Sequence, residues 1–178
     1  GEQKEFVFDT ETDGLDLFTA KLLGISFCWE NGTAYYVEAT KEFLEKLKPV
    51  FENKEIKKIA HNLKFDVKAL LMQGIEVQNL YFDTMIASYL LNPGSRAHKL
   101  DDLVFREFGY QMTKITDLIG KGKGQTTLAL VDNNKVSDYS CEDADYTWRL
   151  VKGLKAQLKK NKLTKLFEEI EMPLVEVL

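Results

Sequence analysis

The chain has 178 residues, 44% of them hydrophobic and 29% charged, with a formal net charge of −4. This length allows one domain with a hydrophobic core, and the composition is typical of a soluble globular protein. No stretch approaches the ~18 consecutive apolar residues of a membrane span, and no basic-then-apolar leader indicates secretion. Cys28 and Cys141 lie in no CxxC or Cys/His pattern, which argues against a zinc site or a disulfide framework and favours a reducing compartment.

The N-terminal elements are predicted to be strands that include a hairpin. Apolar runs predict strands over residues 6–9, 22–29 and 33–37, and Asn31-Gly32 is a turn signal between the last two. Thr40 then caps a helix whose apolar positions recur at helical spacing, Phe43, Leu44 and Leu47.

Strands and helices alternate in the rest of the chain. In chain order we expect a strand at 56–60, a helix at 63–72 ending at Gly74, an extended segment at 77–82, a helix capped by Asp83 and broken at 92–95, a helix at 100–108, a flexible loop at 120–124, a long helix at 136–158, and a helical segment from Leu163 that Pro173 interrupts. A hairpin followed by this alternation predicts an α/β domain with a mixed sheet.

Acidic residues follow directly on the first predicted strand, in the stretch FVFDTETDG. Asp9 and Glu11 are two apart and share a face if the strand extends that far. Two such carboxylates repel unless one is protonated or a cation lies between them, and Mg²⁺ or Mn²⁺ prefers oxygen ligands of this kind. The alternative is a solvated acidic turn, because the following positions suit a turn, Thr12, Asp13, Gly14 and Asp16.

A second polar group opens the helix at 63–72. Asn62 and Asp66 are four apart and share a helix face, and Asp66 lies at the edge of the apolar stripe, Leu63, Val67, Leu70 and Leu71. Asn62 also suits the role of a simple N-cap.

The third group lies within the long helix. Tyr139 and Asp143 fall on one stripe with apolar residues, Val136, Leu150 and Leu154. An inward carboxylate is costly unless it is paired or metal-bound, so a structural salt bridge competes with a metal site as the explanation of Asp143. Glu142 and Asp145 lie off this stripe and need no role beyond solvation.

These three groups resemble the exonuclease motifs of the DEDD superfamily: DTET at 9–12, NLKFD at 62–66 and YSCED at 139–143. The tyrosine of the third motif is typical of the DEDDy branch. FDTMIASYLLNP, LDDL, GKGKGQ and EIEMPLVEVL further resemble the 3′-5′ proofreading domain of family A DNA polymerase I, over essentially the whole chain. The resemblance implies a ribonuclease H-like fold, a mixed β-sheet flanked by helices, with the exonuclease domain at residues 1–165 and the start of the connection to a polymerase domain at 166–178.

The resemblance also implies a mechanism. Two divalent metal ions, Mg or Mn, would be held by the four carboxylates: Asp9 bridges both, Glu11 and Asp143 complete one, and Asp66 serves the other. Tyr139 would orient the attacking water. The product would be a nucleoside 5′-monophosphate, released from the 3′ end of single-stranded or frayed DNA.

Substrate contacts carried over from the family are Leu15, His61, Asn62 and Phe65. Loop cations could meet phosphates or be ordinary surface charges, Arg96, Lys99, Lys121 and Lys123. The family's basic residue before His98 is Ala97 here, and His98 itself is expected to be structural. The basic run from Arg149 to Lys165 is interpreted as a solvated helix face rather than a phosphate-tracking surface.

Two other functions stay open. The domain could hold DNA or brace a polymerase without cutting, or it could be a ribonuclease D-like 3′ RNA exonuclease. The expected partners are a single-stranded DNA 3′ end and a polymerase domain in a longer protein, with no membrane. The isolated domain is expected to be a monomer, located in the cytoplasm with the nucleoid or in an organelle.

Overall fold

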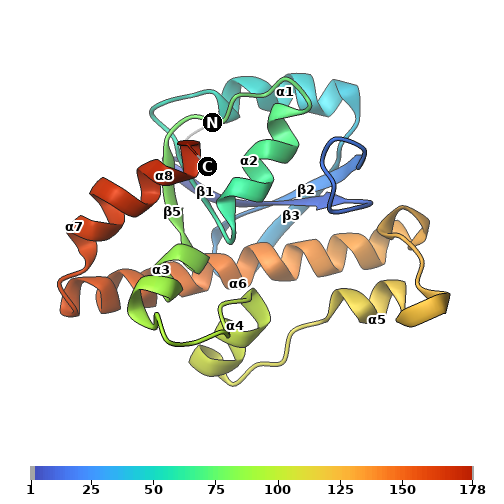
Figure 1. Cartoon of the computed structure of the whole chain (residues 1–178). Coiled ribbons are helices and arrows are strands. Elements are labelled where there is room, and N and C mark those ends of the chain that lie inside the picture. The colour runs from blue at the N-terminus through green and yellow to red at the C-terminus, as the bar shows by residue number, and fades with distance from the viewer. Residues whose placement is uncertain (1–2, 178) are drawn as a thin grey trace.

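A five-stranded mixed sheet forms the centre of the computed structural model, which describes residues 3–177 (Figure 1). Its strand order is β3-β2-β1-β4-β5, with β1 antiparallel to β2 and parallel to β4. The strands are β1 (Glu5–Thr12), β2 (Leu22–Glu30), β3 (Thr33–Glu38), β4 (Lys57–Ala60) and β5 (Leu80–Asp83). The sequence-based expectation of a mixed sheet in an α/β domain is confirmed.

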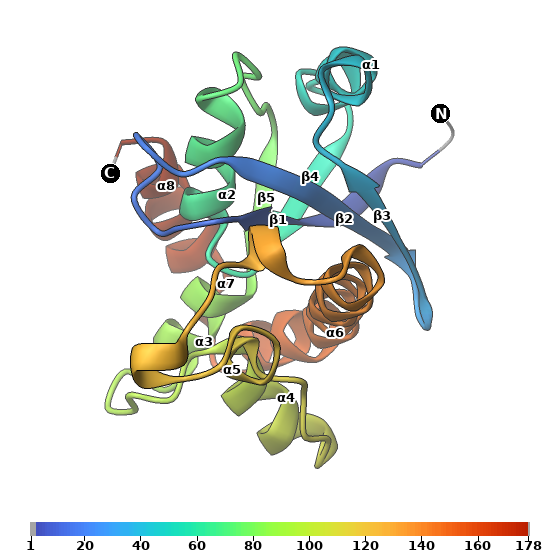
Figure 2. The ribbon, with the colours of Figure 1, turned by 90° about the vertical axis from the view of Figure 1, so that its right-hand side faces the viewer.

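Helices cover both faces of the sheet (Figure 2). The long helix α6 crosses one face against β1, β2 and β3, with α4 and α5 on its outer side, while α1 and α2 lie on the other face. The helices are α1 (Lys41–Phe51), α2 (Leu63–Leu71), α3 (Thr84–Leu91), α4 (Leu100–Phe108), α5 (Ile115–Ile119), α6 (Asn133–Lys160), α7 (Thr164–Leu166) and α8 (Met172–Val177). Short 3-10 turns, η1 (Gly122–Gly124) and η2 (Leu128–Leu130), and a π-helical turn, η3 (Phe167–Glu171), complete the chain.

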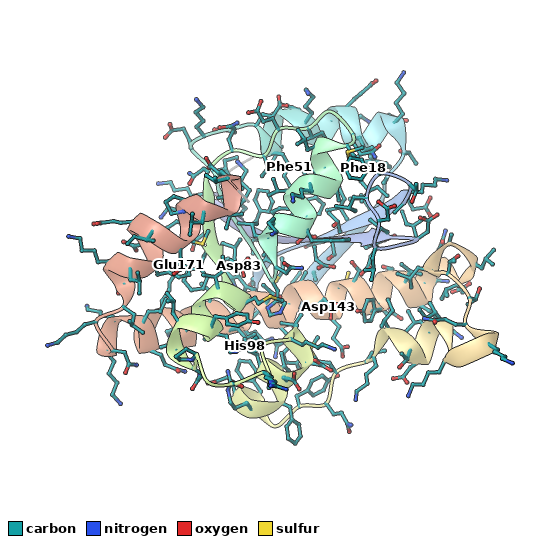
Figure 3. All side chains as sticks on the ribbon, viewed as in Figure 1. Phe18, Phe51, Asp83, His98, Asp143 and Glu171 are labelled. Carbon is teal, nitrogen blue, oxygen red and sulfur yellow. The ribbon has the colours of Figure 1, made fainter. Side chains whose placement is uncertain are left out.

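An aromatic cluster packs against β1 on the face of the sheet that α1 covers. The ring centroids of Phe51 (labelled in Figure 3) and Phe8 lie 5.0 Å apart, and both side chains are fully buried. Phe6 and Phe27 pack against them. Full burial of one such side chain stabilises the fold by about 2–3 kcal/mol. The next residues of β1 therefore emerge from a rigid base.

β1 is longer than predicted. It runs to Thr12 because β2 continues to pair with it, Asp9 opposite Ser26 and Glu11 opposite Gly24. The condition that Asp9 and Glu11 share a strand face is therefore met. The extended segment predicted at 77–82 becomes a strand only from Leu80.

Two details near the end of the chain differ from the sequence-based picture. Pro173 does not end the terminal helix: it is the second residue of α8, which continues without a break from the π-helical turn η3. The irregularity lies earlier, in the π-helical turn, where the ring centroid of buried Phe167 lies 4.7 Å from that of Phe82.

The glycine-rich loop at 120–124 carries a hydrogen-bonded 3-10 turn, with Gln125 N donating to Gly122 O at 3.1 Å. In the part of the chain from residue 3 to 177, no helix is long and apolar enough to cross a membrane.

Candidate active site

Three elements bring the sequence motifs to one cavity of about 240 Å³. β1, α2 and α6 carry the five residues predicted to be catalytic, and all five line this cavity: Asp9, Glu11, Asp66, Tyr139 and Asp143. His61, Asn62 and Phe65 also line it, as predicted for substrate contacts, but Leu15 does not. Residues up to 134 positions apart in the chain, Asp9 and Asp143, thus line the same cavity.

Asp9, Glu11 and Asp143 bring their carboxylate oxygens close together in the cavity. Each offers one oxygen, and these oxygens lie within 4.8 Å of one another. Glu11 is 5% exposed, and its Oε1 has no hydrogen-bond partner within residues 3–177. A buried carboxylate oxygen without a donor is costly, so this arrangement suits a cation better than it suits the bare protein.

The electrostatics of the four carboxylates agree with that interpretation. Burial raises the pKa of Asp9 well above its ordinary value, and Glu11, Asp66 and Asp143 raise it further. Burial likewise raises the pKa of Glu11 to about 7 and that of Asp143 well above its ordinary range. None of the ion pairs found among residues 3–177 involves these acids, so the salt-bridge explanation of Asp143 has no support there.

Asp66 is held beside this cluster by Thr10. Its Oδ1 accepts hydrogen bonds from the Thr10 backbone N at 2.9 Å and from Thr10 Oγ1 at 2.6 Å. It is 2% exposed, and burial raises its pKa to about 8 although the Thr10 bonds act in the opposite direction. The strand residue between Asp9 and Glu11 therefore fixes the position of the carboxylate on α2.

Asn62 occupies the N-cap position of α2, as predicted, but its side chain makes no capping hydrogen bond. Its backbone is left-handed (φ 67°), and the capping acceptor is Asp83 on the neighbouring strand. Asp83 Oδ2 accepts from Leu63 N at 2.8 Å, and its Oδ1 accepts from Met85 N at 2.7 Å. One buried carboxylate thus caps both α2 and α3, which the sequence revealed only for α3 (Figure 3).

His61 presents one ring nitrogen without a partner. Its Nδ1 pairs with Thr84 Oγ1 at 2.8 Å, whereas buried Nε2 has no hydrogen-bond partner within the described chain. Burial lowers the pKa of His61 to about 4, so the imidazole is neutral at physiological pH. His98 is structural, as expected: it is buried, bonds to Ser88 Oγ at 2.8 Å and stacks on Tyr89.

Tyr139 lies one helical turn before Asp143 on α6. Burial and then the charge of Asp143 raise the pKa of its hydroxyl above its ordinary value, so Tyr139 is a neutral donor. Sequence reasoning missed a hydrogen bond between β2 and α6 beside Tyr139: Ser26 Oγ donates to Ser140 O at 2.8 Å. Because Ser26 is the register partner of Asp9, this bond holds α6 against the strands at the site.

Two acids assigned to solvent have structural roles instead. Glu142 accepts hydrogen bonds from Tyr110 Oη and from Thr113 N, both at 2.8 Å. Asp145 accepts from Gly32 N at 2.7 Å and pairs with Arg149 at 2.6 Å. Arg149 lies one helical turn after Asp145 on α6, a spacing that the sequence does show, whereas Tyr110, Thr113 and Gly32 lie outside α6 and could not be found from its helical pattern.

Leu15 lies on the loop between β1 and β2, where it is 89% exposed. Phe18 on the same loop is 88% exposed, and sequence reasoning did not single it out (Figure 3). Hydrogen bonds order the loop, including Lys21 N to Asp13 Oδ1 at 2.6 Å, so Asp13 has the turn role that its spacing suggests.

Comparison with known proteins identifies a family and relatives that the chain resembles. A protein-family model described as a 3′-5′ exonuclease matches residues 1–159. The chain is 36% identical over 184 residues to DNA polymerase I of Borreliella burgdorferi and 37% identical over 185 residues to that of Chloroflexus aurantiacus. These alignments cover 98% and 97% of this chain but 20% and 19% of the relatives, so the chain spans about one fifth of their length.

Solved structures show a shared fold. A polymerase domain structure of Pol1 from M. smegmatis in complex with DNA primer-template and dNTP superposes with a TM-score of 0.78 at 18% identity, covering 98% of this chain and 28% of that one. Escherichia coli RNase D, an exoribonuclease, superposes with a TM-score of 0.76 at 15% identity, covering 98% of this chain and 44% of that one. Brucella melitensis NrnC with bound Mg²⁺ gives 0.72 at 22% identity, with 93% and 78% covered.

Proposed function

The chain belongs to the 3′-5′ exonuclease family, whose ribonuclease H-like fold it has, and from this premise we propose that it is a metal-dependent exonuclease acting on DNA. It would remove nucleoside 5′-monophosphates from the 3′ end of single-stranded or frayed strands. The observation that carries the proposal is the cavity in which four carboxylates and Tyr139 meet, with three ligand oxygens within 4.8 Å.

The residues present fit divalent cations. Hard ions such as Mg²⁺ and Mn²⁺ take carboxylate oxygens. Here Glu11 and Asp66 are buried, Asp9 and Asp143 are partly buried, and none of the four forms an ion pair with a basic residue among residues 3–177. Asp9, Glu11 and Asp143 would hold one ion, and Asp66 with Asp9 would hold a second. A bound divalent cation supplies charge neutralisation at the phosphate and lowers the pKa of water.

The chain's own residues would orient the reaction. Tyr139 stays protonated because its pKa is raised, so its hydroxyl can donate a hydrogen bond to the attacking oxygen and aim it at phosphorus. Thr10 keeps Asp66 in place through two hydrogen bonds. Burial lowers the pKa of His61 to about 4, which makes its imidazole a weak base, so we assign His61 a substrate contact rather than proton transfer.

DNA is the substrate that the relatives favour, since both sequence relatives named above are DNA polymerases I. An unpaired end enters an enclosed site more readily than a duplex, because the target nucleotide must leave the stack. Leu15, His61, Asn62 and Phe65 would contact that strand. We further propose that residues 166–178 connect residues 1–165 to a polymerase domain in a longer cytoplasmic protein and that the isolated domain is a monomer.

The decisive test is Asp9→Ala, assayed on 5′-labelled single-stranded DNA with Mg²⁺ or Mn²⁺. The wild-type protein should shorten the strand one nucleotide at a time from the 3′ end, and the variant should not. Asp102→Ala, which removes an exposed acid on α4, is the matched control and should keep full activity. A wild-type protein without activity, or equal rates for wild type and Asp9→Ala, would refute the mechanism.

Two comparisons separate the alternatives. Equal-sequence DNA and RNA oligonucleotides distinguish a DNA exonuclease from a ribonuclease D-like enzyme, because faster trimming of RNA favours the latter. Calorimetric titration with Mn²⁺ distinguishes an enzyme from an inactive module, since the module would bind no ions at the carboxylates.

A further inference from the structure

A second cavity adjoins the carboxylate cavity. It measures about 380 Å³, and its lining includes Met112–Thr116, which precede and open α5. The two cavities share four lining residues, Lys99, Leu100, Tyr139 and Asp143. They are therefore two compartments of one groove that begins at β1 and α2 and continues between α6 and the N-terminal ends of α4 and α5, which lie along the same side of α6 (Figures 1 and 2). We name them the carboxylate compartment and the α5 compartment.

The carboxylate compartment repels a phosphodiester strand. Its lining includes four acids, and within residues 3–177 Lys99 is the one lysine or arginine that lines it. Unit charges ~4 Å apart interact by about 4 kcal/mol near a protein surface, so one cation here changes the local field substantially. Divalent ions would offset the acids around the scissile phosphate, whereas a neighbouring phosphate needs its own counter-charge.

Lys99 is placed to provide that charge. It is an exposed residue that lines both compartments from the first position before α4. It takes part in none of the ion pairs found among residues 3–177. The other cations considered from the sequence, Arg96, Lys121 and Lys123, line neither compartment.

We propose that Lys99 binds a phosphodiester of the substrate where the strand passes between the α5 compartment and the carboxylate compartment. This proposal rests on the proposed nuclease function. It singles out one of four loop cations by its position, and it makes Lys99 a substrate-binding residue rather than a member of the metal site.

The first experiment measures DNA binding without cleavage. Lys99→Ala and Lys99→Arg are compared with wild type by fluorescence anisotropy of a labelled oligothymidylate in EDTA, over a range of salt concentrations. We expect Lys99→Ala to weaken binding about 5–20-fold and to reduce the magnitude of the salt slope by about 0.7, the value for one phosphate contact on a single strand, while Lys99→Arg stays near wild type. Lys121→Ala removes the same charge from outside both compartments and should change binding less than twofold.

The second experiment locates the contact. Single methylphosphonate linkages, which carry no charge, are placed at successive positions from the 3′ end. In the wild-type protein, a methylphosphonate at one position should weaken DNA binding as much as the Lys99→Ala substitution does. In the Lys99→Ala variant, a methylphosphonate at that position should not weaken binding further, whereas methylphosphonates at the other positions should have the same effect as in wild type. Equal losses for Lys99→Ala and Lys121→Ala, or additivity at every position, would overturn the proposal. A wild-type protein that cuts DNA normally with an unaffected Lys99→Ala refutes only this inference, whereas a wild-type protein that neither binds nor cuts DNA refutes both.

Discussion

Glu11→Gln is expected to stabilise the metal-free protein at neutral and alkaline pH. Burial raises the pKa of Glu11 from its ordinary value of 4.5 to about 7, so folding favours the protonated form. At ~1.4 kcal/mol per pKa unit, ionising Glu11 in the folded protein costs about 3 kcal/mol. Gln resembles the protonated acid in shape and removes that cost.

The sign of the pH dependence follows from the raised pKa. The wild-type protein has the full stability of protonated Glu11 below pH ~4.5 and loses it as the pH rises to about 7, above which the loss is complete. Glu11→Gln should therefore exceed wild type by about 3 kcal/mol at pH 8 and match it at pH 4. In Mn²⁺ the order should reverse, because a ligand that binds only the folded state stabilises it and the variant lacks one ligand atom.

The assay is urea unfolding followed by circular dichroism in EDTA at pH 4 and pH 8, repeated at pH 8 with Mn²⁺. Glu45→Gln is the matched control, because Glu45 forms only an exposed pair with Lys41 at 3.9 Å and should change stability by less than ~0.5 kcal/mol. If Glu11→Gln destabilises the protein equally at both pH values in EDTA, ionising Glu11 does not cost stability in the metal-free fold, and the reasoning is wrong.

Three further changes test the site and its supports. Asp83→Ala should lower the free energy of unfolding by about 3 kcal/mol, because it leaves the first N–H groups of two helices without an acceptor, and urea denaturation measures this; a loss below ~1 kcal/mol would contradict the double cap. Tyr139→Phe should slow cleavage about 10–1,000-fold while Mn²⁺ affinity measured by calorimetry stays unchanged; an unchanged rate would remove Tyr139 from the mechanism. Gly24→Ala should destabilise the fold by about 1–3 kcal/mol in thermal or urea unfolding, because a Cβ there would lie 2.0 Å from Tyr36 Oη; the truncation Tyr36→Val should then relieve most of that loss, and a double variant no better than Gly24→Ala would count against this contact.

The sequence alone determined the motifs and most of the helices and strands, although it did not predict α5 or the full length of β1. Strand alternation placed Asp9 and Glu11 on one face, and helical spacing placed Tyr139 beside Asp143, because these relations depend only on the local repeat of the backbone. The hairpin turn at Asn31-Gly32 and the helix over Leu100–Phe108 likewise followed from local residue chemistry.

Only the tertiary structure decided which groups meet. Thr10 holds Asp66 across 56 positions, and Ser26 ties α6 to the sheet across 114, through contacts that leave no periodic signal in either segment. The same reason explains what the sequence did not reveal: the capping hydrogen bond of α2 goes to Asp83, which lies on the next strand of the sheet, and Glu142 bonds to a loop more than 25 residues away. Local pattern fixes the face on which a side chain lies, whereas strand order and helix packing determine what lies opposite that face.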